Sequence, residues 1–239
     1  MSNLLVSRID ERPDFPLLRV ALEPGQKVFA EPGAMVTMTS GVKLTAGFRG
    51  GIGATIGRAL GGESLILSTY TATESGEVAF APPSLGDIQH VRLDGSGTVL
   101  VQRGAFLAHG EGVEVSASWQ GARGFFSGQG LVMLKASGRG DLFFNSFGAL
   151  IPLDVASEGL IVDTGFIVAF DDTVDYRVRS LPNARSGLFS KLKTFFMGGE
   201  AIVCEFSGRG RVWIQARQLG SYLSWVHPYR PVKQRSSDD

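Results

Sequence analysis

The feature that most constrains this chain is a glycine-anchored pattern that occurs three times. Each occurrence runs through a turn, an apolar stretch, a polar pair, a pivot glycine and a second apolar stretch. The three segments are LEPGQKVFAEPGAMV (22–36), LDGSGTVLVQRGAFLA (93–108) and VASEGLIVDTGFIVAF (155–170), with pivots Gly33, Gly104 and Gly165. A pattern that recurs in the same order indicates an internal repeat, which must be recognised before any single motif is interpreted.

A second glycine marker follows each pivot. It lies in ESGEVAFA (74–81), SGRGDLFFN (137–145) and SGRGRVWIQ (207–215), at Gly76, Gly140 and Gly210. Two markers in one order predict three tandem repeats of a β-sandwich or double-stranded β-helix, closed around a pseudo-threefold axis so that each covers its neighbour's sheet edge. The repeats span about 5–90, 91–153 and 154–225. They form one all-β domain over residues 1–229, followed by a polar tail at 230–239.

The all-β class follows from the local pattern. Short runs rich in Val, Ile, Phe and Thr are bounded by Gly, Pro, Asn or Asp at intervals of about 8 to 12 residues, as in sandwiches and barrels. With 44% hydrophobic and 19% charged residues, the composition excludes general disorder. Alternating βα units are absent from the pattern, which argues against a dinucleotide-binding sheet.

Charge and cysteine content bear on partners and location. The 23 basic and 23 acidic residues give no net charge, so nucleic acid is an unfavoured partner and self-association is favoured. The first guess is a homo-oligomer, a trimer or a multiple of three. One cysteine, no signal-peptide pattern and no apolar run of about 20 residues predict a reduced, cytoplasmic protein that does not span a membrane.

The segment GFRGGIGATIGRALGGES (47–64) suggests a phosphate-binding loop at first sight. It lacks the lysine of the P-loop motif, and its glycines do not have the dinucleotide spacing. Matching segments occupy the same place in the other repeats, so we interpret all three as apolar inserts in the β framework. The third predicts a short amphipathic helix near 187–197.

These inserts supply the candidate contact surface of the protein. Its residues are Ile52, Ile56, Leu60, Phe125, Phe126, Leu188, Phe189, Leu192, Phe195 and Phe196. Burial of such side chains contributes roughly 1.5 to 3 kcal/mol each, so we expect them to be covered. Three covers stay open: the rest of the chain, a second subunit, or a membrane surface or client protein.

Catalytic and metal-binding patterns are weak. His90, His109 and His227 lie far apart and predict no metal site. His109 near Glu111 and Glu114 offers a lone acid–base pair, although a solvated turn residue is the preferred interpretation. We expect no catalytic residues and no cofactor, and therefore not an enzyme.

Three further residues or segments have a structural interpretation. Cys204 lies among apolar neighbours and is expected to be a buried, inert thiol. Trp213 beside Arg211 imitates a base-stacking strand, but core packing is preferred. The segment SYLSWVHPYRP (221–231) is expected to form an edge strand, with a ligand lid through Trp225 and Tyr229 as the alternative.

Four blocks carry a family resemblance: LEPGQKVFAEPGAMVTM, GGESL, VQRGAFLA and FSGRGRV around Gly208. Over about residues 5–220 the chain resembles the altered-inheritance-of-mitochondria family of conserved proteins of unknown function. The resemblance implies a fold similar to the tryptophan RNA-binding attenuation protein, with double-stranded β-helix units that assemble into oligomers. It implies no catalytic residues, and its mitochondrial member suggests a role in membrane organisation or complex assembly.

The sequence therefore predicts a non-enzymatic oligomeric scaffold or interaction protein with a protein or peripheral membrane partner. The alternative is a small-ligand or nucleic-acid binding module with a pocket between repeats.

Overall fold

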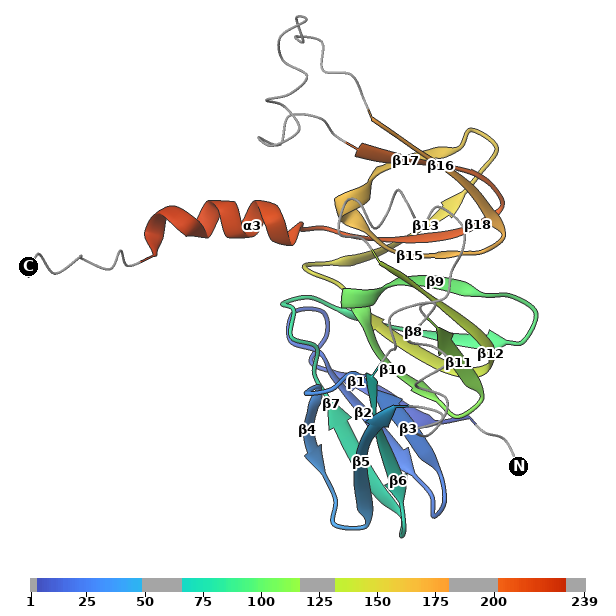
Figure 1. The fold of residues 1–239 in the computed structure, drawn as a ribbon, viewed down its shortest axis with the longest axis vertical. Helices are drawn as coiled ribbons and strands as arrows, with labels where there is room; N and C mark the ends of the chain where they lie inside the picture. Colours follow the sequence, from blue (N-terminus) through green and yellow to red (C-terminus); the bar gives the residue numbers. More distant parts are fainter. Residues whose placement is uncertain (1–3, 49–65, 117–131, 181–201, 231–239) are drawn as a thin grey trace, which may run out of the picture.

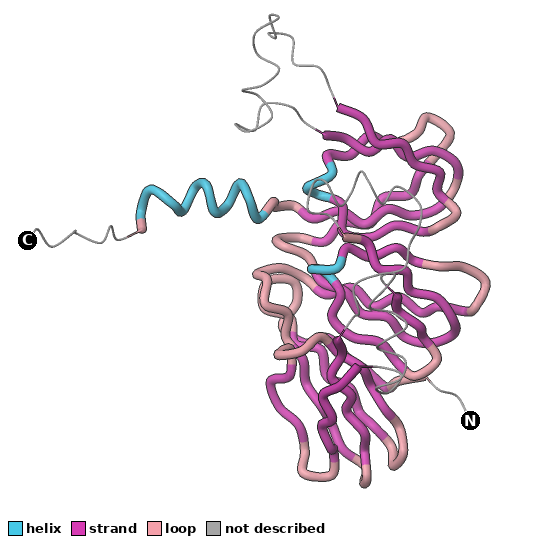
Figure 2. The backbone as a smooth tube through the Cα atoms, viewed as in Figure 1, coloured by secondary structure: helices cyan, strands magenta, loops and turns pink. Residues whose placement is uncertain are grey.

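The computed structural model describes residues 4–48, 66–116, 132–180 and 202–230. Strands dominate these segments, and α3 (Leu219–Val226) is the one α-helix within them (Figure 2). The predicted all-β class is confirmed. The predicted helix near 187–197 and all ten residues of the candidate contact surface lie outside the described segments.

The strands fall into three sequence-local groups that follow one another along the long axis of the molecule (Figure 1). The first group occupies the lower end of the view. Its strands are β1 (Val6–Asp10), β2 (Leu17–Leu22), β3 (Lys27–Ala30), β4 (Met35–Met38), β5 (Val42–Phe48), β6 (Ile66–Ala72) and β7 (Gly76–Phe80). A four-stranded sheet has the order β1-β2-β7-β4, and β3, β6 and β5 continue the large sheet of the molecule.

The second group is built around one long strand. Its elements are β8 (Ile88–Asp94), β9 (Val99–Gln102), the 3-10 turn η1 (Arg103–Ala105), β10 (Phe106–Gly110), β11 (Val113–Ser116) and β12 (Met133–Asn145). The first half of β12 pairs with β9 and β11, and its second half pairs with β8 and β10, all antiparallel. β12 therefore pairs with each of the other strands of this group.

The third group forms the upper end of the molecule and leads into the helix. Its elements are β13 (Leu150–Val155), β14 (Leu160–Asp163), the 3-10 turn η2 (Thr164–Phe166), β15 (Ile167–Asp171), β16 (Val174–Ser180), β17 (Ile202–Gly208) and β18 (Gly210–Gln215). After β18 come α3 and the 3-10 turn η3 (His227–Tyr229).

The groups are joined side by side by two antiparallel strand pairs. β10 of the second group pairs with β3 of the first, and β15 of the third pairs with β9 of the second. Through these two junctions, nine strands form a single path from β13 to β5, with β8 and β11 paired to it through β12. These pairings do not confirm the predicted closure around a threefold axis: among the described strands, β4 pairs only with β7 and β14 only with β17.

Three hydrophobic clusters form the core, and each draws side chains from a neighbouring group. Leu107 and Phe143 of the second group pack into the cluster of the first, and Val168 and Trp213 of the third pack into that of the second. Alternation explains the inward faces: along β2, every second residue from Leu18 to Leu22 is buried. The groups therefore share parts of their apolar interior.

The segment after β18 differs from its prediction. The expected edge strand is wrong, because Leu219–Val226 is helical and leaves the sheets sideways (Figure 1). Its apolar residues Leu219, Tyr222, Leu223 and Val226 have the spacing i, i+3, i+4, i+7 of a helix face. This period outweighs the strand preference of the aromatic side chains.

Candidate functional site

The exposed apolar side chains of the C-terminal segment form the candidate site, which we call the α3 surface. It consists of Leu219, Tyr222, Leu223, Trp225 and Tyr229, whose exposed fractions run from 38% to 77%. No residue of α3 is buried. A soluble protein rarely exposes contiguous apolar area of this kind without an interaction partner.

The helix is attached firmly at its base. The backbone N–H groups of Ala216 and Arg217 donate to the carbonyl oxygens of Ala149 and Phe147, at 2.9 and 3.2 Å. The ring of Phe147 meets that of Tyr222 edge-on, with centroids 5.3 Å apart. The helix therefore begins at a defined place on the third group, and its remaining length projects away from the strands.

The pivot glycine Gly165 is part of this attachment. A Cβ at Gly165 would lie 1.8 Å from the side-chain amide nitrogen of Gln218, the residue that precedes α3. The same amide region thus packs directly on the η2 backbone. The glycine pattern predicted a place for Gly165 in the strand repeat, but no local signal in the sequence indicated its second role at the base of the helix.

The charge of this region is of one sign. From Phe206 to Ser237 the sequence contains six Arg or Lys residues and no Asp or Glu. Arg217 and Arg230, both exposed, lie on either side of α3 in the sequence. An apolar helix face flanked by basic residues is the arrangement found at anionic interfaces.

A polar cluster separate from the α3 surface lies in the interior of the second strand group. Asp141, whose side chain is fully buried, accepts hydrogen bonds from the Leu5 backbone N–H at 2.7 Å and from Arg92 at 3.3 Å, and its Oδ1 lies 2.8 Å from Nε2 of His90. Burial raises the pKa of Asp141, but the His90 and Leu5 hydrogen bonds and the nearby His90 and Arg92 charges outweigh burial and leave it lowered. The cluster holds the N-terminal segment against β8 and β12, and no sequence pattern indicated it.

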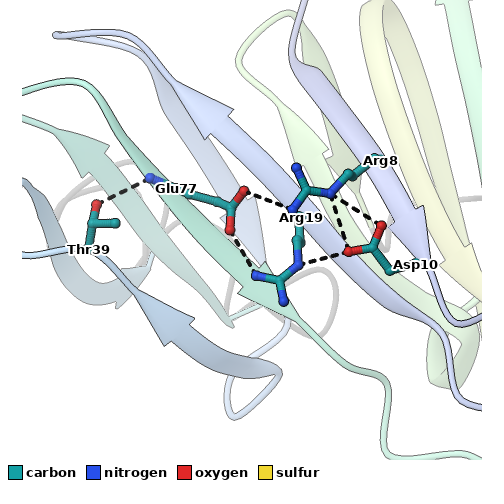
Figure 3. A network of polar contacts seen from close by, with 5 residues as sticks. All are labelled: Arg8, Asp10, Arg19, Thr39 and Glu77. Atoms are coloured by element: carbon teal, nitrogen blue, oxygen red, sulfur yellow. Dashed lines mark hydrogen bonds and ion pairs between the residues drawn. The ribbon is translucent and has the colours of Figure 1, made fainter.

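An ion-pair network covers one face of the four-stranded sheet (Figure 3). Arg19 of β2 donates to Asp10 of β1 and to Glu77 of β7, each at 2.8 Å, and Arg8 adds a contact to Asp10 at 3.2 Å. The backbone N–H of Glu77 also donates to Thr39 Oγ1 at 3.2 Å. Because the charges are matched within the network, it ties β1 to its neighbours and does not present a charged binding site.

The residues weighed for chemistry have structural positions. His109 is fully buried in β10, with Nδ1 2.7 Å from the Gly110 carbonyl oxygen and its ring stacked on Phe29. The expected solvated turn residue is therefore wrong, because the β10–β3 junction covers it. Its proposed partner Glu111 instead forms an ion pair with Lys27 at 3.4 Å. Trp213 is 4% exposed, which confirms core packing and leaves no face for a stacked base.

The described segments offer neither a cluster of metal ligands nor a membrane-spanning helix. Within them, no group of three or more His, Cys, Asp or Glu side chains could hold a metal ion. No helix in the described part of the chain has the length and apolar character that a bilayer crossing needs.

Cys204 is expected to resist thiol reagents in the folded protein. The side chain is fully buried, and burial together with the neighbouring Glu205 charge raises the pKa of the thiol to about 12. We expect less than a tenth of one equivalent to react with a chromogenic disulfide reagent at pH 8, and a full equivalent after unfolding in guanidinium. Rapid reaction of the native protein would contradict the burial.

The fold and its surfaces define a class of protein: an all-β chain of laterally joined strand groups whose described part shows structural polar clusters and a projecting helix with exposed apolar side chains. Residues 7–217 match the family described as mitochondrial biogenesis AIM24, and the chain belongs to this family. The predicted family resemblance is thereby confirmed, whereas likeness to the tryptophan RNA-binding attenuation protein stays a prediction. The α3 helix begins just beyond the matched residues.

Individual relatives agree with the family assignment. The chain is 28% identical over 241 residues to an uncharacterized protein of Streptococcus pyogenes serotype M6, covering 97% of this chain and 94% of the relative. It is also similar to the X-ray crystal structure of a Streptococcus pyogenes protein, with 27% identity and a TM-score of 0.75, covering 95% of this chain and 100% of that one.

Proposed function

We propose that this chain is a non-enzymatic scaffold that assembles with further copies of itself and docks on an anionic lipid surface through the α3 surface. The observation that carries the docking is a helix with no buried residue, whose exposed apolar side chains lie in a run of sequence without acidic residues. A cytoplasmic location accompanies this proposal, supported by a single cysteine that offers no internal disulfide.

The scaffold role is supported by three strand groups with matching pairings. In each group, a strand that precedes the pivot glycine pairs with the last strand of that group; these pairs are β2–β7, β8–β12 and β13–β18. The strand after each pivot glycine pairs with that same last strand. In all three pairs the register shifts at the same distance from the pivot glycine, at Val36, Leu107 and Val168. We infer that the chain contains three repeats of one unit, and repeated units are suited to assembly.

The energetics favour weak docking by one chain and firm docking by an assembly. Burial of Leu219, Leu223 and Trp225 in the lipid interface contributes roughly 1.5 to 3 kcal/mol each, and each nearby Arg or Lys adds about 1 kcal/mol at an anionic surface. The loss of translational and rotational freedom consumes much of this gain. Several copies in one particle bind together and raise the overall affinity.

Flotation of the full chain with lipid vesicles tests the docking. We expect the protein to float with vesicles of phosphatidylcholine and phosphatidylglycerol, and much less with phosphatidylcholine alone. Combined Leu223→Ser and Trp225→Ser should lower the bound fraction roughly tenfold or more, because two exposed apolar side chains of the α3 surface are lost.

The matched control is Phe15→Ser, which changes a side chain that is 75% exposed and lies far from α3 in the sequence. It should leave flotation unchanged. Absence of flotation for the unaltered chain, or equal flotation of the α3 variant, would rule out lipid docking through α3. A protein partner would then be the remaining occupant of this surface.

A further inference from the structure

We propose that the exposed edge of β4 in one copy of this chain pairs with the exposed edge of β14 in the next copy. The inference rests on the proposed scaffold role, because it names the surface and the register by which copies assemble. The two strand pairs that join the groups inside one chain supply the geometry.

The two internal junctions are equivalent residue by residue. At the first, Ala108, His109 and Gly110 of β10 lie opposite Ala30, Phe29 and Val28 of β3. At the second, Ala169, Phe170 and Asp171 of β15 lie opposite Val101, Leu100 and Val99 of β9. Counted from the pivot glycines, both junctions join the same positions of a unit to the same positions of the preceding unit.

A polar contact flanks both junctions at the same position. Lys27 Nζ lies 3.4 Å from Glu111 Oε1 at the first. At the second, the Asp172 backbone N–H donates to the Thr98 carbonyl oxygen at 2.9 Å, and the Thr98 N–H donates to Asp172 Oδ1 at 3.2 Å. The junction is therefore a reproducible contact between neighbouring units.

Among the strands that the structure describes, one such contact is left open in the first group and one in the third. β4 is the first-group counterpart of β10 and β15, and β14 is the third-group counterpart of β3 and β9. β4 lies in the lowermost group and β17, the partner of β14, in the uppermost (Figure 1), so the two edges do not meet within one molecule. A second copy can supply the missing strand to each.

The side chains at these edges are exposed only where a neighbouring unit is missing. Ile161 of β14 is 56% exposed, whereas its counterpart Leu100 is 3% exposed. Met38 of β4 is 41% exposed, whereas its counterparts His109 and Phe170 are fully buried. Val36 repeats the contrast, since it is 53% exposed and its counterparts Leu107 and Val168 are fully buried.

Other edge strands carry the features that prevent pairing. Among the described edges, β1, β5, β8, β11, β13 and β16 each contain a charged residue or a proline, such as Arg8 in the ion-pair network or Pro152. In contrast, β4 is uncharged, and the one charged residue of β14, Asp163, accepts a hydrogen bond from the Gly165 N–H at 2.9 Å. These two edges therefore lack such protection, and their counterparts in the other groups pair with each other at the internal junctions.

The register of the contact follows from the internal junctions. Met38 of one copy lies opposite Ile161 of the next, and Thr37 lies opposite Val162, in antiparallel orientation. Because the two surfaces differ, the contact is head-to-tail, and it yields a ring if the rotation closes and a longer array if it does not.

Light scattering of the full chain and three lysine variants tests the contact. We expect the unaltered chain to have a mass of several chains, and both Ile161→Lys and Met38→Lys to reduce it to that of one chain, because a lysine at an edge cannot be buried there. The matched control Leu44→Lys changes a β5 residue that is 43% exposed and should keep the assembled mass. Circular dichroism confirms folding of each variant.

Disulfide formation tests the register independently. A Met38→Cys chain mixed with an Ile161→Cys chain should give a covalent dimer under mild oxidation, whereas each alone, or Met38→Cys with Leu44→Cys, should not. The native Cys204 is buried and does not interfere.

The outcomes separate this inference from the scaffold role. An unaltered chain that is monomeric at all concentrations overturns both. An assembled chain whose mass is unaffected by the β4 and β14 lysines, or an assembled mixture that forms no Met38–Ile161 disulfide, overturns only this inference. Dissociation by both lysines together with the disulfide supports it.

Discussion

Replacing Phe170 by alanine is expected to lower the free energy of unfolding by about 3–5 kcal/mol. Phe170 is fully buried in β15, where its ring packs against Tyr176 and Phe206 with centroids 5.4 and 5.3 Å away. It also lies opposite Leu100 at the junction between the second and third groups. The substitution therefore removes apolar contacts within a group and between groups.

Urea denaturation at a fixed chain concentration measures this change, since assembly makes the apparent stability depend on concentration. Phe15→Ala is the control: its ring is 75% exposed, and the change should stay within about 0.5 kcal/mol. A loss below about 1 kcal/mol for Phe170→Ala would show that the third-group core is not packed as described.

Replacing Asp141 by asparagine is expected to cost about 3 kcal/mol at neutral pH, because the substitution removes a buried charge that faces His90 and Arg92. The cost should depend on pH. The pKa of Asp141 is lower in the folded chain than its ordinary value, so its contribution is present above about pH 4 and is lost as the pH falls through the lowered pKa.

Denaturation curves from neutral pH into the acid range measure this dependence, and the difference between the unaltered chain and Asp141→Asn should shrink below about pH 4. Asp154→Asn is a suitable control, because the Asp154 side chain is 78% exposed and its ion pair with Arg211 lies at the surface. A pH-independent difference for Asp141→Asn would show that the loss comes from packing and not from charge.

Much of the β framework could be predicted from local sequence. Alternating Val, Ile, Leu and Phe between glycine turns predicts strands because neighbouring side chains on a strand face opposite sides of a sheet. The three pivot glycines all lie between two strands: Gly33 between β3 and β4, Gly104 in η1 and Gly165 in η2. Buried Cys204 and Trp213 were predictable for the same reason, since each occupies an apolar strand.

The errors arose where partners lie far apart in the sequence. His109 was predicted to be a turn residue from its place at the end of a hairpin. Its burial could not be predicted locally, because Phe29 of β3, which stacks on its ring, is distant in the chain. Asp141 had no local signal, because Leu5, His90 and Arg92 reach it from two other segments. The α3 surface had a local signal, the i, i+3, i+4, i+7 spacing of its apolar residues, which the edge-strand prediction did not use.

The sequence alone determined the strands, the glycine turns between them and the family, because these depend on periodicity and on residues that tolerate tight turns. Only the tertiary structure decided which strand edges are covered. Coverage depends on the positions of whole units, and the same strand position is buried at Leu100 and exposed at Ile161 because one has a neighbouring unit and the other does not.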